Sequence, residues 1–283
     1  MIHATPEGRL LRNPFTPAEA GSKQASCLRS ILVGLCVLGI ALVTIPHVRS
    51  AVPANVPALP TSTANQLILV VTPDWNSSHA TLQTFERTDQ GWRTTSAGTP
   101  VVIGKSGSAW GLGLHPAQPG LQKHEGDGRS PAGVFNLGSA FGYASSLRMQ
   151  WPYAAMSDND YCVDVAASPL YNRIVDTGKV SAADVAGSTE PMRRDLHEHG
   201  DQAYKLGLVI EHNPQHLRGA GSCIFAHLWH SPDTGTAGCS AMAEPVLTRL
   251  LKWLKPQDHP VFVLLPQAEY ARLKSAWDLP SLE

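Results

Sequence analysis

Short apolar runs separated by turn-forming residues dominate the chain downstream of residue 65. Runs of about four to eight residues that are rich in β-branched and aromatic side chains, and bounded by Gly, Pro, Asp and Ser, are typical of β-strands. The sequence therefore predicts a mainly β domain over residues 66–266. The expected strands lie at 66–72, 80–87, 100–104, 133–138, 205–212, 222–229 and 259–266.

Only two segments have a helical pattern. The first, residues 244–254, carries Pro245 in its first turn and an apolar stripe at positions 246, 247, 250, 251 and 254. The second, residues 267–277, begins a C-terminal helical tail expected over 267–283. We find no internal repeat and no heptad pattern.

The N-terminal segment has the order of a secretory signal. Basic residues precede an uncharged apolar run at 31–43, and small residues follow at 50–54. The run is shorter than the roughly 20 residues of a membrane-spanning helix. We expect a signal peptide over 1–50, with an uncleaved N-terminal anchor as the alternative. Either one predicts an exported protein that contacts the membrane only through this segment.

A proline-containing, uncharged stretch follows. Residues 51–65 include Pro53, Pro57 and Pro60 and no charged side chain. This composition predicts an extended linker between the targeting segment and the domain.

Charge excludes one class of partner. The chain of 283 residues has 22 Lys and Arg against 23 Asp and Glu, a formal net charge of −1. No cationic excess is available to bind phosphate backbones, so nucleic acid is not an expected partner.

Three cysteines remain outside the targeting segment: Cys162, Cys223 and Cys239. In an oxidising compartment two of an odd set tend to pair. We expect a Cys162–Cys223 disulfide, because both lie in strand-like apolar surroundings, and a free Cys239 beside a glycine. The alternative is that all three are reduced and buried.

The stretch "HLWHSPDTGTAGCSAM" suggests a nucleophile. A thiol needs a neighbour that lowers its pKa. A hairpin-like loop at 230–235 would bring His227 beside Cys239, and the helix beginning near Glu244 would favour a thiolate. Gly238 could present backbone N–H groups to an oxyanion. The alternative is a hydrogen-bonded core histidine and a packed cysteine.

"TAGCSAM" preceded by "IFAHLW", together with segments 101–114, 123–138, 162–176 and 221–229, resembles the L,D-transpeptidase catalytic domain of the YkuD type, in a less studied exported branch. The resemblance covers residues 66–266. It implies a β-sandwich or barrel-like catalytic domain with a few helices, located in the bacterial periplasm or cell envelope.

The resemblance also implies roles for single residues and needs no cofactor. Cys239 would be the nucleophile and His227 its base. The Gly238 and Cys239 backbone would form part of the oxyanion hole, and Thr236 would steady the loop. Better-known members carry His before the Gly and Arg shortly after the Cys, whereas this chain has Ala237 and then "SAM".

The implied partners are peptidoglycan stem peptides. Cys239 would attack the carbonyl before a terminal D-alanine, and an amine from a second stem would resolve the thioester into a 3-3 cross-link. Resolution by water would make the protein an L,D-carboxypeptidase instead. Lys123, Arg129 and Arg218 could bind stem carboxylates or could be solvated charges.

Two other functions compete. His197, His199 and Asp201 reproduce the H-x-H-x-D spacing of a zinc hydrolase. The second alternative is a non-catalytic envelope module that binds peptidoglycan. It is suggested by the absence of the arginine that better-known members carry shortly after the Cys.

Overall fold

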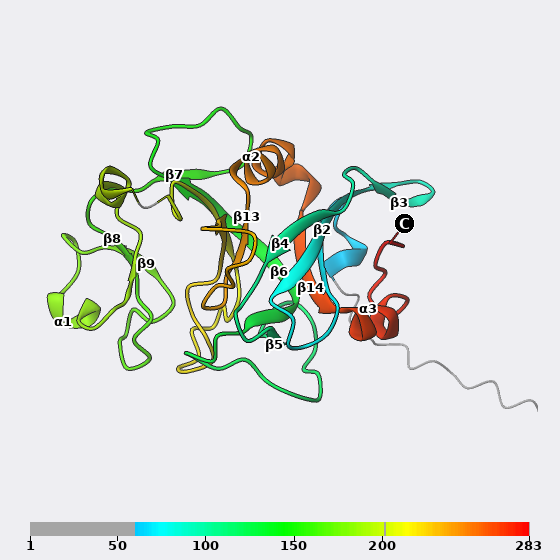
Figure 1. Cartoon of the computed structure of the whole chain (residues 1–283), viewed down its shortest axis with the longest axis horizontal. Coiled ribbons are helices and arrows are strands. Elements are labelled where there is room, and N and C mark those ends of the chain that lie inside the picture. The colour runs from blue at the N-terminus through cyan, green and yellow to red at the C-terminus, as the bar shows by residue number, and fades with distance from the viewer. Residues whose placement is uncertain (1–59, 201, 283) are drawn as a thin grey trace, which may run out of the picture. The chain divides into compact units, whose positions relative to one another are not determined.

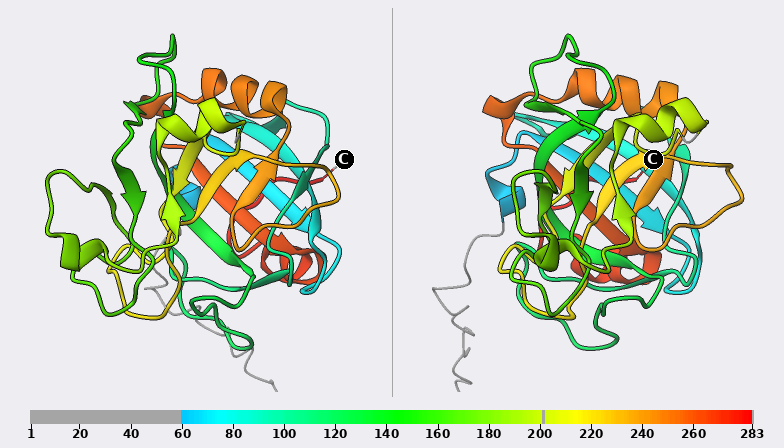
Figure 2. Two further views of the ribbon diagram at one scale, coloured as in Figure 1. Left: turned by 60° about the vertical axis from the view of Figure 1, so that its left-hand side comes forward. Right: turned by 90° about the vertical axis from the view of Figure 1, so that its left-hand side faces the viewer.

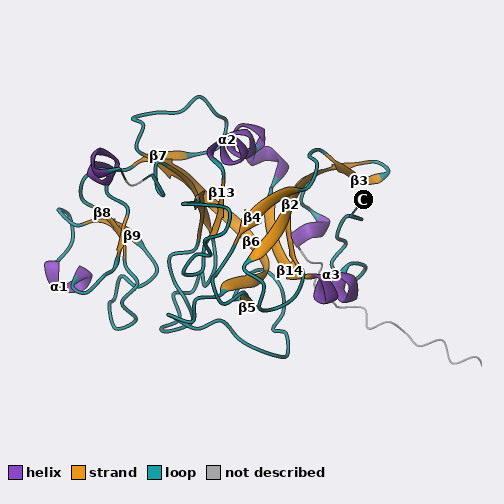
Figure 3. Cartoon of the chain, viewed as in Figure 1, coloured by secondary structure: helices purple, strands orange, loops and turns teal. Residues whose placement is uncertain are grey.

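A computed structural model of the protein describes residues 60–200 and 202–282. Strands outnumber helices and lie in one large and one small sheet (Figure 3). The strands are β1 (Gln66–Thr72), β2 (His79–Thr88), β3 (Gly91–Thr94), β4 (Thr99–Val102), β5 (Ser108–Trp110), β6 (Ser130–Gly142), β7 (Tyr153–Ala155), β8 (Asp160–Cys162), β9 (Ile174–Asp176), β10 (Glu190–Pro191), β11 (Leu206–Ile210), β12 (Phe225–Leu228), β13 (Ser240–Met242) and β14 (Val261–Pro266). The helices are α1 (Ala182–Val185), α2 (Glu244–Trp253) and α3 (Gln267–Leu273), with 3-10 turns η1 (Pro60–Ser62), η2 (Arg194–His199) and η3 (Pro256–Asp258).

The large sheet closes into a barrel. Its strand order is β1-β14-β6-β11-β12-β13-β4-β2-β3, and β1 also pairs with β2. β8, β9 and β10 form a separate three-stranded sheet beside the barrel (Figures 1 and 2). The expected mainly β fold is confirmed, and each of the seven expected strand segments overlaps an observed strand.

Continuous apolar runs form the centre of the barrel. Every residue of β1 and of β14 is buried, and the two strands pair in parallel from Leu67 with Val261 onward. Strands buried on both faces read as unbroken apolar runs rather than as alternating ones. Helix α2 covers the barrel through Leu247, Leu250 and Leu251, which are buried.

The C-terminal segment belongs to the barrel domain. Helix α3 ends at Leu273, earlier than expected, yet the N–H groups of Lys274 and Trp277 still bond to carbonyls four residues back. Trp277 is buried and its ring stacks on His115 at a centroid distance of 5.3 Å. The end of the chain is therefore packed against the core as far as the described residues extend.

The last residues of the expected linker, 60–65, pack in the domain. Thr61 and Ala64 are fully buried, and the Arg87 guanidinium donates to the carbonyls of both. Residues 60–65 are thus part of the domain, because their backbone carbonyls complete the hydrogen bonding of Arg87. Residues 1–59, with the expected signal and the rest of the linker, lie outside the described residues. Each helix in the described part of the chain lacks the length and hydrophobicity that a bilayer-spanning segment needs.

Gly133 in β6 is a position where a side chain should be costly. Its φ is +140°, and a Cβ there would overlap the imidazole of His115, which the Trp277 and Phe135 rings hold in place. We expect Gly133→Ala to lower the free energy of unfolding by about 1–3 kcal/mol in urea titrations.

The matched control is Gly126→Ala. Gly126 also has a positive φ, +73°, but open space surrounds it. In Gly126→Ala only the strain of a left-handed backbone should lower the free energy of unfolding, by about 1 kcal/mol. An equal loss in both variants would contradict the overlap with His115.

Candidate functional site

Strands β12 and β13 carry the two candidate residues. They pair in parallel, with His227 beside Ala241, so the hairpin-like arrangement expected from the sequence is wrong. The segment between them runs back along the sheet and re-enters it in the same direction. Cys239 lies directly before β13, two residues before Ala241. It is therefore a diagonal neighbour of His227 across the strand pair.

Ala241, opposite His227, shares the face of the His227 side chain. Cys239 precedes β13, and its Sγ is hydrogen-bonded to the backbone of Phe225 and Cys223. Cys239 and His227 also line one cavity of about 330 Å³. Its other walls include Glu190, Tyr204, Trp229 and Thr236.

The Cys239 thiol is almost fully buried, with 6% of the residue exposed. Its S–H points at the carbonyl of Cys223, with Sγ 3.4 Å from that oxygen, and its sulfur accepts from the Phe225 N–H at 3.3 Å. Burial raises the pKa of this thiol, and the nearby Glu190 carboxylate raises it further. The resting site therefore holds a neutral thiol.

The expected help from a helix N-terminus is absent. Helix α2 begins at Glu244, after the whole of β13, so about 16 Å of extended chain separates its first residue from Cys239. The effect of a helix dipole fades within its first turn. This part of the sequence interpretation was wrong, since a strand rather than a loop follows Cys239.

A raised thiol pKa has a consequence for stability. Above about pH 8.5 the unfolded chain releases the thiol proton while the folded protein keeps it, so folding becomes less favourable as pH rises further. When the pH is raised from about 7 to about 10, the free energy of unfolding should fall less in Cys239→Ala than in the wild type. Urea titrations at both values would test this, and identical losses in the two proteins would contradict it.

The backbone beside His227 orients its ring. Its Nδ1 lies 2.8 Å from the carbonyl oxygen of Leu228, and a carbonyl can only accept. Nδ1 therefore carries a proton and donates it to this carbonyl. The residue is 8% exposed, and its ring meets the Tyr204 ring edge-on at 5.3 Å.

Thr236 ties the loop before Cys239, in the role that the resemblance implies. Its hydroxyl donates to the Cys239 carbonyl at 2.6 Å and accepts from the Gly238 N–H at 3.1 Å. The Gly238 N–H is therefore already bonded and does not point to an oxyanion, contrary to expectation. Close packing accounts for the glycine, because a Cβ would lie 3.0 Å from the Arg129 carbonyl oxygen.

Ser130 braces the same loop from the start of β6. Its buried hydroxyl donates to the Gly238 carbonyl at 2.7 Å and accepts from the Gly104 N–H at 2.9 Å. No sequence pattern pointed to Ser130, since a serine where a strand begins is ordinary composition.

Glu190 and Tyr204 are further site residues that sequence reasoning missed. The Tyr204 hydroxyl donates to the Glu190 carboxylate, and both line the cavity of Cys239 and His227. Glu190 comes from the small sheet and Tyr204 from the turn before β11. No local pattern links these distant segments.

Cys162 and Cys223 form a disulfide with a Cα–Cα distance of 5.9 Å, the pairing that the odd cysteine count predicts. Cys239 is the free cysteine of the described part of the chain. Cys223 has a left-handed φ of 56°, and Asn172 Oδ1 accepts its N–H at 2.9 Å. The disulfide and Asn172 together hold the carbonyl that receives the Cys239 S–H.

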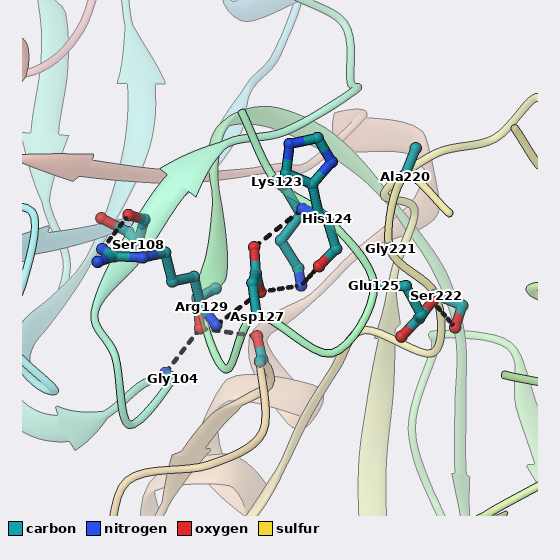
Figure 4. Close-up of polar contacts among 12 residues, drawn as sticks. Gly104, Ser108, Lys123, His124, Glu125, Asp127, Arg129, Ala220, Gly221 and Ser222 are labelled. Carbon is teal, nitrogen blue, oxygen red and sulfur yellow. Dashed lines mark hydrogen bonds and ion pairs between the residues drawn. The ribbon is translucent and has the colours of Figure 1, made fainter. Parts of the chain in front are cut away.

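Two of the three expected carboxylate binders are structural. Lys123 is buried and its Nζ binds Asp127 Oδ1 at 2.6 Å and the His124 carbonyl at 2.8 Å (Figure 4). Arg129 donates to the carbonyls of Trp75 and Ser108 and to the side chain of Asn76, each at 3.0 Å. Both cations are committed to fixing loops rather than to holding a substrate.

Arg218 differs from these two. It is exposed, in the loop before β12, and does not line the cavity of Cys239 and His227.

The H-x-H-x-D motif is described only in part. His197 Nδ1 is 2.8 Å from Gln202 Nε2, and its ring lies against Tyr143. The His199 side chain and Asp201 lie outside what the structure describes. Elsewhere in the described ranges, no three His, Cys, Asp or Glu side chains gather as metal ligands would.

Comparisons of the chain with protein family models, with curated proteins and with solved structures find no match in any of the three.

Proposed function

We propose that the protein is a cysteine-dependent acyltransferase acting on peptidoglycan stem peptides, an L,D-transpeptidase. One observation carries the proposal. Cys239 and His227 line one cavity of about 330 Å³, in which His227 Nδ1 lies 2.8 Å from the Leu228 carbonyl oxygen. A thiol and a neutral imidazole in one cavity are the minimum for acyl transfer through a thioester.

The reaction begins from a neutral thiol. As Cys239 Sγ bonds to the carbonyl carbon before the terminal D-alanine, its proton passes to His227 Nε2. The imidazolium then gives that proton to the departing D-alanine amine as the C–N bond breaks. An amine of a second stem then attacks the thioester carbonyl, takes the acyl group from Cys239 Sγ and forms the 3-3 cross-link. If water attacks instead, the products are those of a carboxypeptidase.

The substrate class rests on a resemblance to L,D-transpeptidases, which lies in segments 101–114, 123–138, 162–176, 221–229 and 236–242. A mainly β barrel with a side sheet is compatible with that domain type. The Cys162–Cys223 disulfide supports an oxidising compartment, as export to the cell envelope requires.

A non-catalytic module that binds peptidoglycan is the second candidate. Burial and the high pKa of the Cys239 thiol favour it, as does the Gly238 N–H being bonded to Thr236. This protein would bind stem peptides without forming a thioester.

Incubation with a tetrapeptide stem separates these functions. We expect mass spectrometry to find released D-alanine together with either a 3-3 linked dimer or a free tripeptide, and neither product with Cys239→Ala. Binding of the stem without any product would favour the non-catalytic module. Product formation by Cys239→Ala would contradict the proposed nucleophile.

A further inference from the structure

A second cavity, of about 600 Å³, lies away from the thiol, between the loop after β6 and helix α2. Its size is within the roughly 300–1,000 Å³ of small-molecule sites. Six of its lining residues are apolar or aromatic: Tyr143, Ala144, Leu147, Met149, Leu206 and Leu251. One of them, Leu147, leaves 37% of its surface exposed.

Cations surround this apolar lining. Lys205 is paired with Glu244 at 3.0 Å, whereas Arg148 and Lys252 form no ion pair with any other described residue. Glu244 is the one carboxylate among the lining residues of the described chain. The cavity therefore presents apolar walls beneath two uncompensated positive charges, the complement of an anionic head on an apolar body.

We propose that this cavity binds an anionic amphiphile, a single molecule with a carboxylate or phosphate head and an aliphatic chain. The chain lies against Leu147, Met149 and Leu251, and the head is placed between Arg148 and Lys252. This site is independent of acyl transfer. Lys205 and Leu206 of this cavity follow Tyr204 of the thiol cavity along the chain, and Tyr143 packs in one cluster with Tyr204.

Calorimetric titration of the full chain with dodecanoate, below its micellar concentration, tests the proposal. We expect saturable binding at one site, with dodecylamine bound at least about tenfold more weakly because of the excess positive charge. Shortening the carboxylate to decanoate should weaken binding by up to about fourfold per methylene lost.

Three single substitutions test whether dodecanoate binds in this cavity. Thr248→Trp places an indole in the cavity from α2 and should reduce dodecanoate affinity at least about tenfold. Lys252→Gln removes one cation and should weaken dodecanoate about two- to fivefold while leaving dodecanol unchanged. Arg249→Gln, on the same helix but outside the cavity lining, is the matched control and should bind as the wild type does. Thermal melts establish that each variant is folded.

Opposite outcomes overturn the inference. These are an absence of saturable binding, equal binding of dodecanoate and dodecylamine, or unchanged affinity in a folded Thr248→Trp. Co-sedimentation with anionic phospholipid vesicles is the last arm. Vesicle binding without dodecanoate binding would place a membrane surface here instead of a single amphiphile and would also overturn it.

Discussion

Replacing His227 with Gln is expected to slow acylation of Cys239 by about 10²–10⁴-fold, because the neutral thiol loses the base that accepts its proton. Glutamine keeps a polar side chain of similar reach but cannot take up a proton. The rate would be followed as growth of the acylated mass under single-turnover conditions.

His230→Gln is the matched control. His230 lines the same cavity but is exposed, in the connection between β12 and β13. It should acylate at the wild-type rate. A wild-type rate in His227→Gln, or equal losses in the two variants, would contradict the role of His227 as base.

Removing the disulfide should have the largest effect on stability. The Cys162–Cys223 bridge spans 61 positions of sequence, and closing a loop of this length in the unfolded chain is worth about 4 kcal/mol. We expect the double variant Cys162→Ser, Cys223→Ser to lose about that much free energy of unfolding in urea titrations. Wild-type protein treated with a reductant should approach the same value.

The same variant should disturb the thiol. Cys223 holds a left-handed backbone conformation and presents its carbonyl to the Cys239 S–H. Without the disulfide this segment is released, and alkylation of Cys239 by iodoacetamide should become faster. Unchanged stability together with unchanged alkylation would show that the bridge supports neither the fold nor the site.

The strands could be predicted because their apolar runs are local signals. The runs at 66–72 and 259–266 both correspond to observed strands, β1 and β14, and the helix at 244–254 corresponds to α2. Alternation also placed His227 on a definite face of its strand. The odd number of cysteines, combined with expected export, predicted that two of them pair, and the apolar surroundings of Cys162 and Cys223 indicated which two.

The direction of β13 could not be predicted, because pairing direction depends on the path of the connection rather than on local composition. Parallel pairing removed the expected hairpin and put strand β13 between Cys239 and helix α2. The sequence likewise contained no sign that Lys123 is buried and paired with Asp127. Ser130, Glu190 and Tyr204 reach the site from three other segments, and a single sequence carries no pattern that joins them.

Acylation of one sulfur is the most direct test of the central claim, that Cys239 and His227 form a working acyl-transfer pair. The measurement is the intact mass of the wild-type protein after incubation with a carbapenem, with peptide mapping of the adduct. We predict one adduct, located on Cys239 and missing from Cys239→Ala. An unmodified wild-type protein, or an adduct that persists in Cys239→Ala, would contradict the account.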